Sequence, residues 1–409
     1  MRVLILSIIV LSLLLVLRYL FYLQTITNRV GSSLEVTISL LADPQDSFAK
    51  QVFQLQGVRI EAPDYPVLRY GDKLSVSGVI EERTFTPQGT DKEVKLLVIE
   101  NPVIKKLPQD NIFIFSASFL RNRVYNSFKS QLSGNEATLL FGIVFGGSSG
   151  FSSEMKEAFR NTGVLHVVAA SGMNVSMVGA FLLSAFSRIF HRRTALLFTI
   201  MGIFYYSLIS GFQPSILRAA IMASVALSAA YLGRQAYGFL TLFLTAWVML
   251  IFTPETLFQV GFLLSFTATF GILLIKPVFD QVSLVKRTQV VSDDIATTVS
   301  AQLGSLPVMV GVFSTYSFIS ILINALVLWT IPFLMILGGI AAFCAIVLPF
   351  LSFIPLYGSL PLLWYFEKVI TIFGSVPLLT IEGVSVLIWI SYYFLLVSVV
   401  LFVKQRGKK

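Results

Sequence analysis

Apolar runs long enough to cross a lipid bilayer recur along most of this chain, and they constrain its fold more than any other feature. A hydrocarbon core about 30 Å thick needs roughly 20 helical residues to span it. With 56% hydrophobic and 12% charged residues, the chain lies outside the range of soluble domains. We therefore predict a multi-pass α-helical membrane protein of about ten spans, at residues 1–23, 163–185, 194–210, 215–233, 238–253, 257–275, 296–313, 318–348, 361–378 and 384–403.

The side of the membrane on which each loop lies follows from its cations. Residues 1–23 begin Met1-Arg2 and lack a small-residue cleavage site, so they predict a retained membrane anchor. Cytoplasmic loops are rich in Lys and Arg, and ten loop and tail cations then fall on the side of the amino terminus: Arg192, Arg193, Arg234, Lys276, Lys286, Arg287, Lys404, Arg406, Lys408 and Lys409. Both termini are expected in the cytoplasm. A break between 318 and 353, at Pro332 or Pro349, would add a span and move the carboxyl terminus to the other side.

Residues 24–110 have a different pattern, with short runs of alternating polarity separated by turn sequences such as PDYP and TPQGTD. Such runs predict strands, and we expect a small extracytoplasmic all-β domain. About five strands suit an OB-like barrel, although a sandwich fits the pattern equally well. The segment holds 10 Lys and Arg against 12 Asp and Glu, so the positive net charge of the chain comes from elsewhere.

Residues 111–135 predict an amphipathic helix at the membrane interface. Its apolar stripe contains Phe113, Ala117, Leu120, Val124, Phe128 and Leu132, and its cations Arg121, Arg123 and Lys129 are expected off that stripe. The apolar run that follows Gly134 is too short to span and suits a re-entrant segment. Residues 136–409 would form the membrane domain.

Polar side chains inside apolar runs mark the candidate site. The run 163–185 contains His166, Ser171 and Asn174, which would share one face of a helix. Such groups either line a wet path or bond neighbouring helices together, and the pattern does not decide between these. Three other runs resemble broken or pore-facing helices, at 211–218, 258–271 and 300–307. Arg218 follows the Gln213-Pro214 break and could also extend its side chain to the lipid headgroups.

Metal and hydrolytic chemistry have little support in the sequence. The chain has one cysteine and two histidines, too few for the usual zinc sites. A Ser171–His166 pair lacks an acidic residue in the same run to orient the imidazole. We expect no cofactor, no metal and no enzymatic activity.

Four blocks, in order, resemble the ComEC family of competence proteins. GVLHVVAASGMNV is similar to the family hallmark Gly-Leu-x-His-Leu-Leu-Ala-x-Ser-Gly-Leu-His-Val, and YYSLISGFQPSILRAAIM resembles its Tyr-x-x-Leu-x-Gly-x-x-Pro-Ser-x-x-Arg-Ala block. TPETLFQVGFLLSFTATFGI and the segment from SAQLGSLP onward resemble two later blocks. Asn174 stands where the family usually has a second histidine, and Thr253 replaces its usual Asp. The metallo-β-lactamase-like domain that many members carry does not follow Lys409, so a short form is expected.

The resemblance implies a cytoplasmic-membrane channel that passes single-stranded DNA inward during natural transformation. It nominates as path-lining residues His166, Ser171, Asn174, Gln213, Arg218 and Gln259. Aromatic and basic residues available for DNA binding by the β-domain are Phe53, Arg59, Tyr70, Lys73, Phe85, Lys92 and Lys95. Expected partners are single-stranded DNA, the lipid bilayer, a separate nuclease, a DNA receptor and a cytoplasmic translocase.

Two other functions fit the same features. The broken helices could form the midplane pocket of a transporter for a small polar solute or lipid-linked precursor. The chain could also be a scaffold whose β-domain binds a protein.

Overall fold

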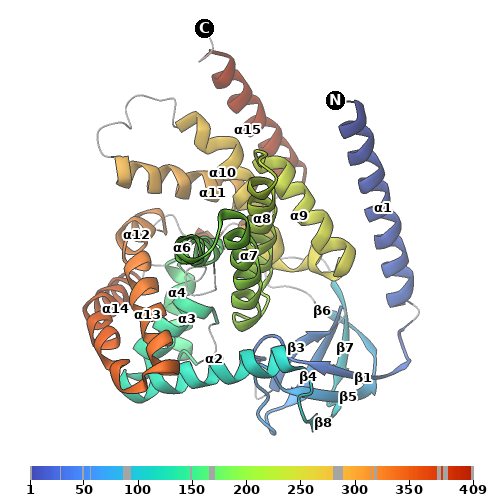
Figure 1. Cartoon of the computed structure of the whole chain (residues 1–409). Helices are drawn as coiled ribbons and strands as arrows, with labels where there is room; N and C mark the ends of the chain where they lie inside the picture. Colours follow the sequence, from blue (N-terminus) through green and yellow to red (C-terminus); the bar gives the residue numbers. More distant parts are fainter. Residues whose placement is uncertain are drawn as a thin grey trace.

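The structure joins a small β-domain to a larger body of helices (Figure 1). It is a computed structural model, and it describes residues 2–27, 29–47, 50–55, 57–85, 94–147, 150–164, 171–279, 289–313, 315–316, 320–374, 379–380 and 386–406. The first helix, α1 (Arg2–Thr27), leads into the β-domain. The remaining helices follow the β-domain in the chain.

Eight strands make the β-domain. They are β1 (Ser33–Ser39), β2 (Gln45–Ser47), β3 (Lys50–Leu55), β4 (Val58–Pro63), β5 (Lys73–Val79), β6 (Glu81–Phe85), β7 (Val94–Glu100) and β8 (Val103–Leu107). One residue separates β5 from β6 and two separate β7 from β8, so each pair forms one long bent strand. These two bent strands run antiparallel, through β5 with β8 and β6 with β7. The domain was predicted as all-β, and it is.

The strand pairing closes on itself. β1 pairs with β5, β2 with β3, and β3 with β4, all antiparallel, whereas β4 pairs with β7 in parallel. If β1 and β2 are counted as one strand interrupted at 40–44, five strands follow one another in a closed circle. Alternate residues point inward, and Ile60, Leu74, Val76 and Ile99 are fully buried there. These side chains belong to two clusters, one that holds Ile60, Leu74 and Val76 and another that holds Ile99.

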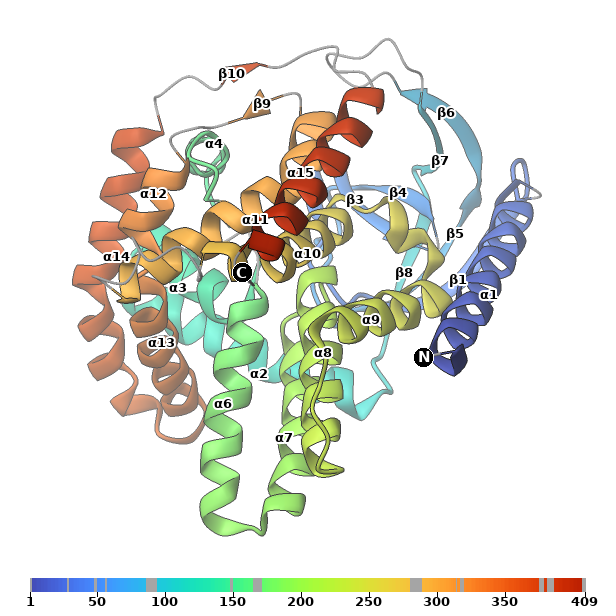
Figure 2. The same ribbon diagram turned by 90° about the horizontal axis from the view of Figure 1, so that it is seen from above.

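The helical body contains α2 (Ile112–Gln131), α3 (Gly134–Phe145), α4 (Ser153–Asn161), α6 (Gly172–Ile189), α7 (Arg192–Ile209), α8 (Pro214–Tyr231), α9 (Gly238–Phe252), α10 (Val260–Phe279), α11 (Gln289–Phe313), α12 (Ser320–Val327), α13 (Thr330–Val347), α14 (Phe353–Phe373) and α15 (Val386–Arg406). Short 3-10 turns, η1 (Pro254–Phe258) and η3 (Pro349–Leu351), precede α10 and α14. Seen from above, α12–α14 and α1 lie on opposite sides of the body, and the α6–α7 hairpin projects from it (Figure 2).

Six helical segments among the described residues are long and apolar enough to cross a membrane: Gly172–Ile189, Pro214–Tyr231, Val260–Phe279, Ile295–Val312, Thr330–Val347 and Pro349–Phe373. Four shorter apolar helices accompany them, at Val10–Thr25, Gly134–Phe145, Gly238–Phe252 and Leu387–Val400. The predicted run 318–348 is divided between α12 and α13 at Leu328–Trp329, and a second break follows at Pro349, one of the two prolines considered, where η3 separates α13 from α14. The chain is thus a helical multi-pass protein, as predicted.

The predicted amphipathic helix exists as α2, which lies crosswise from the α13–α14 pair to the β-domain (Figure 1). Its buried side includes Ala117, Val124 and Phe128, as expected, but Phe113 is 67% exposed. The prediction that Arg121 lies away from the buried side was wrong, since its side chain is only 8% exposed. It is buried because it has partners. Its guanidinium forms an ion pair of 3.0 Å with Asp43 of the β-domain and donates to the carbonyl of Ile209 at 2.9 Å.

The helices α10 and α11 lie side by side in both views and approach closely (Figures 1 and 2). A Cβ on Gly304 would stand 2.7 Å from Cα of Gly271, so only glycine permits this approach. The run 300–307 was expected to be a broken or a pore-facing helix, and α11 continues through Pro307 without a break. Proline leaves the carbonyl four residues earlier without its helical donor. The Tyr392 hydroxyl of α15 donates to that carbonyl, of Leu303, at 2.8 Å.

Candidate functional site

The amino-terminal ends of three helices lie close together. They are α6 at Gly172, α8 at Pro214 and α10 at Val260. A Cβ on Gly172 would lie 2.9 Å from Nη2 of Arg218, and a Cβ on Gly261 would lie 3.9 Å from Cγ of Pro214. The amino-terminal turns of α6 and α10 therefore flank that of α8, which carries Arg218.

The charges at this junction are positive. Arg218 Nε donates to Oγ of Ser265 on α10 at 2.6 Å, and its Nη1 lies 3.5 Å from the Met222 sulfur. Within the described part of the chain, Arg218 forms no ion pair with an acidic side chain. None of the three helices has an acidic residue in its first turn. Because a helix amino terminus carries a partial positive charge, this arrangement favours an anion.

The turn before α8, which leads to Arg218, packs against the β-domain. Gly211 and Phe212 adopt positive φ values of 87° and 47°, which end α7 sharply, and Pro214 opens α8 at a position that needs no N–H. A Cβ on Gly211 would lie 2.6 Å from the carbonyl oxygen of Leu41 in the β-domain. The turn that precedes Arg218 therefore packs directly against the β1–β2 connection.

Asn174 and Ser171 lie at the start of α6 and not in the middle of a long helix. Asn174 is 1% exposed. Its Nδ2 donates to the carbonyl of Ile143 at 2.6 Å, and its Oδ1 accepts from Oγ of Ser171 at 2.9 Å. The carbonyl of Ile143 lies in the last turn of α3, which lacks helical donors. Asn174 therefore satisfies the end of α3 in this structure and does not face an open space.

The other nominated residues are divided by the structure. Gln213 is the residue before α8, Gln259 precedes α10, and both side chains are half-buried near the helix starts. They are thus brought together with Arg218. His166 falls in 165–170, outside the described residues.

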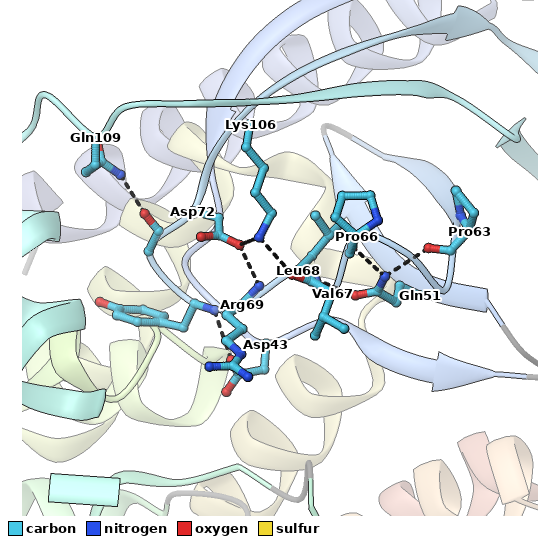
Figure 3. A network of polar contacts seen from close by, with 12 residues as sticks. Asp43, Gln51, Pro63, Pro66, Val67, Leu68, Arg69, Asp72, Lys106 and Gln109 are labelled. Atoms are coloured by element: carbon cyan, nitrogen blue, oxygen red, sulfur yellow. Dashed lines mark hydrogen bonds and ion pairs between the residues drawn. The ribbon is translucent and has the colours of Figure 1, made fainter. Parts of the chain in front are cut away.

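A second polar feature lies where the β-domain meets α2. A groove of about 490 Å³ is lined by Arg69, Lys73, Lys106, Gln109, Phe115 and Asn122, among others. Lys106 pairs with Asp72 at 2.7 Å and donates to the carbonyl of Val67, as Figure 3 shows. Lys73 pairs with Asp110 at 2.8 Å. Lys106 is thus bonded to the loop between β4 and β5, Lys73 is bonded to the segment that precedes α2, and both line the groove.

The buried Gln51 secures the same loop from below. Its amide donates to the carbonyls of Pro63 and Pro66 and accepts from the N–H of Leu68 (Figure 3). Three hydrogen bonds from one buried side chain therefore fix the loop that leads from β4 to β5.

Of the residues nominated for DNA binding in the β-domain, only some are open to solvent. Tyr70 is 3% exposed, its hydroxyl donates to the carbonyl of Leu208 at 2.5 Å, and burial raises its pKa to about 12. Its ring is therefore not open to stack on a base. Phe53 packs against the β-domain core, and Arg59 pairs with Glu61 at 3.0 Å. Lys92 and the side chains of Phe85 and Lys95 lie outside what the structure describes.

Sequence reasoning missed Ser265 and the full role of Arg121. The guanidinium of Arg121 lies 5.2 Å from the Tyr70 ring centroid and 4.9 Å from that of Phe141, distances typical of cation–π contacts. Both residues act through partners that are distant in the chain, which no local pattern reveals.

The fold and this junction define a multi-pass membrane protein with a small β-domain packed over a cationic helix junction. The sequence profile of the competence proteins matches residues 143–406, more than half of the chain, and the chain therefore belongs to the competence protein family. It is 28% identical over 239 residues to ComE operon protein 3 of Bacillus subtilis (strain 168), covering 58% of this chain and 30% of that protein.

A second relative is an uncharacterized protein of Aquifex aeolicus (strain VF5), 27% identical over 164 residues, or 39% of each chain. The chain thus spans about a third of the length of these relatives. No solved structure matches it.

Proposed function

We propose that this protein is a cytoplasmic-membrane channel that passes single-stranded DNA into the cell during natural transformation. The observation that carries the proposal is the junction at Arg218, where three helix amino termini surround a cation without an acidic partner among the described residues. A phosphate backbone crossing a low-dielectric layer needs cations and oriented N–H groups along its path. Membership of the competence protein family supports DNA as the anion.

In this proposal Arg218, Gln213 and Gln259 line the path, together with Ser171 and His166. Asn174 has a different role, because its side-chain amide is hydrogen-bonded to the end of α3 and to Ser171. It would hold α6 so that Gly172 stays against Arg218.

The β-domain would lie outside the membrane and deliver DNA to the junction. Its closed circle of five strands supports an OB-like barrel, a fold that often binds single strands. We assign this step to the groove lined by Arg69, Lys73 and Lys106. We propose the domain limits 24–110 for this module, 111–135 for the interfacial helix and 136–409 for the channel.

The orientation of α7 and α8 supports the predicted side of the membrane for the β-domain. Arg193 at the start of α7 lies 5.6 Å from the Tyr231 ring at the end of α8, so the basic ends of these helices lie together. The opposite ends, at Leu208 and Gly211, contact the β-domain. Basic ends away from the β-domain agree with a β-domain outside and cations inside. A separate nuclease, a DNA receptor and a cytoplasmic translocase would complete the pathway.

Uptake of labelled DNA by cells that carry Arg218→Gln tests the proposal. A hydrogen bond to a charged group contributes about 1.5–3 kcal/mol, and about 1.4 kcal/mol is tenfold in a binding constant. We expect uptake to fall about tenfold or more while membrane abundance is unchanged, with partial rescue by Arg218→Lys. Arg188→Gln, at an exposed site at the end of α6, is the matched control.

Normal uptake in Arg218→Gln would refute the proposed path. Lost accumulation of a small anionic solute with normal DNA uptake would favour the transporter for a polar solute instead.

A further inference from the structure

The groove between α2 and the loop from β4 to β5 has three side chains that are open to a ligand. The Arg69 guanidinium, the Asn122 amide and the Phe115 ring all line it. Within the described part of the chain, no ion pair, side-chain hydrogen bond or ring contact engages these three groups. The volume of about 490 Å³ lies within the range of roughly 300–1,000 Å³ that is typical of ligand sites.

The charges around the groove suit one phosphate. Lys106 pairs with Asp72, and Lys73 pairs with Asp110. Arg69 lies beside the first pair, since its backbone N–H donates to Asp72 at 2.9 Å (Figure 3). Among these five described residues the guanidinium of Arg69 is the cation without a carboxylate partner, and a guanidinium can bind phosphate through two parallel hydrogen bonds. A phosphate diester carries the single negative charge that matches it.

The Phe115 ring lines the same groove as these cations and is 54% exposed. Proteins bind single strands with aromatic rings beside a cationic groove, because bases stack on the rings while the backbone follows the cations. Unpaired bases also offer their edges to hydrogen bonds, and the amide of Asn122 can both donate and accept. A free phosphate would use neither the ring nor the amide. The lining therefore fits a nucleotide of a single strand.

Close packing holds α2 against the loop, so Phe115 keeps its place in the groove. Gly71 has a φ of 88°, and a Cβ there would overlap Cβ of Ser118 on α2. The side chain of Gln109, just before α2, donates to the carbonyl of Gly71 at 2.9 Å. The groove is thus shared between the β-domain and α2, and α2 supplies its exposed aromatic ring.

The surface that OB-like barrels commonly use is less suited to DNA in this protein. Such barrels bind oligonucleotides on the face of their second and third strands, which correspond to β3 and β4. These two strands contain one aromatic residue, Phe53, and it packs against the core. Their cations, Lys50 and Arg59, each pair with Glu61 at 3.0 Å. Neither an open ring nor an unpaired cation is present in β3 and β4.

The groove is also joined to the element that leads to Arg218. Tyr70 lines the groove, and its hydroxyl donates to the carbonyl of Leu208 near the end of α7. The chain then turns at Gly211 and enters α8, which carries Arg218. A strand held in the groove is therefore bound beside the turn between α7 and α8.

We propose that single-stranded DNA is received in this groove, with a base stacked on Phe115 and a phosphate at Arg69, and not on the β3–β4 face. The inference rests on the proposed function and adds α2 to the DNA-binding surface. Stacking and phosphate contacts carry little information on base identity, so the site accepts DNA of any sequence.

Fluorescence anisotropy of the purified full-length chain in detergent tests the site, with labelled oligothymidylate as the probe. Phe115→Ala should weaken binding about fivefold or more, because it removes the stacked base's partner. Phe115→Leu keeps an apolar side chain without a ring and should lose as much, whereas Phe115→Trp should bind normally. The matched control is Phe113→Ala, since Phe113 is 67% exposed on the same helix and does not line the groove. It should bind as the wild type does.

The salt dependence of the same binding tests the phosphate contact. Arg69→Gln should reduce the slope of log affinity against log salt by about 0.7, the value for one phosphate of a single strand. Arg59→Gln, on the β3–β4 face, should leave both slope and affinity unchanged.

Equal affinity of the wild type and Phe115→Ala would overturn the site, and so would normal binding by Phe115→Leu or an equal loss in Phe113→Ala. Loss of binding in Arg59→Gln alone would assign DNA to the β3–β4 face. Tighter binding of a duplex of the same length would exclude stacking on Phe115. Uptake by cells with Arg218→Gln is measured separately, so failure of this site leaves the proposed path at Arg218 standing.

Discussion

Replacing Gly304 by alanine should force apart the close contact between α10 and α11. The added Cβ would stand 2.5 Å from the carbonyl oxygen of Thr267 and 2.7 Å from Cα of Gly271. Carbon atoms pack at about 3.5–4.0 Å, so α10 and α11 would have to separate by about 1 Å. Both contacted atoms belong to the backbone, and no change of rotamer relieves the clash.

The cost follows from measured overpacking, which destabilises by about 1–3 kcal/mol. Gly311 on the same helix is the matched control, because a Cβ there meets nothing within 4 Å. At an open helical site, alanine instead gains up to about 0.5–1 kcal/mol over glycine. The two substitutions should thus differ in sign and by about 1.5–4 kcal/mol.

The assay is the apparent melting temperature of each purified variant in one detergent, followed by tryptophan fluorescence. Gly304→Ala should melt several degrees below the wild type, and Gly311→Ala at or above it. If Gly304→Ala is as stable as Gly311→Ala, α10 and α11 do not touch at this point and the packing described here is incorrect.

Two further predictions concern the β-domain and its attachment. Arg121→Gln should lower stability by about 2–4 kcal/mol, less than for a fully buried pair because Asp43 is partly exposed. The control Lys129→Gln, on the same helix, should change stability by less than about 0.5 kcal/mol. Equal melting temperatures of the two variants would contradict the buried ion pair. Burial tends to raise the pKa of Glu61, but hydrogen bonds and charge from Lys50 and Arg59 outweigh it and hold the pKa below the ordinary range. Its contribution is therefore present at neutral pH and lost as pH falls through the lowered pKa, so the melting temperatures of wild type and Glu61→Gln should converge in acid, and a gap that persists at pH 2 would exclude this role.

Local patterns predicted the elements whose partners are near in sequence or are the membrane itself. The apolar stripe in 111–135 predicted α2, which begins at Ile112 and ends four residues before the predicted limit, at Gln131. Alternation predicted the β-domain, because each strand buries one face against a common core. The turn signals also fell between observed strands, as at Pro63–Pro66.

The errors arose where a polar group is satisfied from far away in the chain. Arg121 looked like a surface cation because Asp43 is 78 residues distant. Pro307 looked like a helix break because the tyrosine that satisfies Leu303 lies 89 residues later. Within a membrane each polar backbone group needs a hydrogen-bond partner. The periodicity of the sequence does not show which distant residue supplies that partner.

The candidate site was located only in part. Arg218, Gln213 and Gln259 were nominated by resemblance, and the structure brings them to one junction. Asn174 was nominated in the same way, and Tyr70 as an aromatic residue of the β-domain, but both are buried and hydrogen-bonded in the structure. Composition cannot distinguish a polar side chain that faces water from one that is hydrogen-bonded within the protein, since both stand out in an apolar run.

The most direct test of the DNA path is photo-crosslinking during uptake. A benzoylphenylalanine at Gln213 or Gln259 would be activated while cells import labelled single-stranded DNA, and Phe343, 63% exposed on α13, provides the control position. The account predicts DNA adducts at both glutamine positions and none at Phe343. Crosslinks at Phe343 alone, or at none of the three while uptake proceeds, would contradict a path through the Arg218 junction.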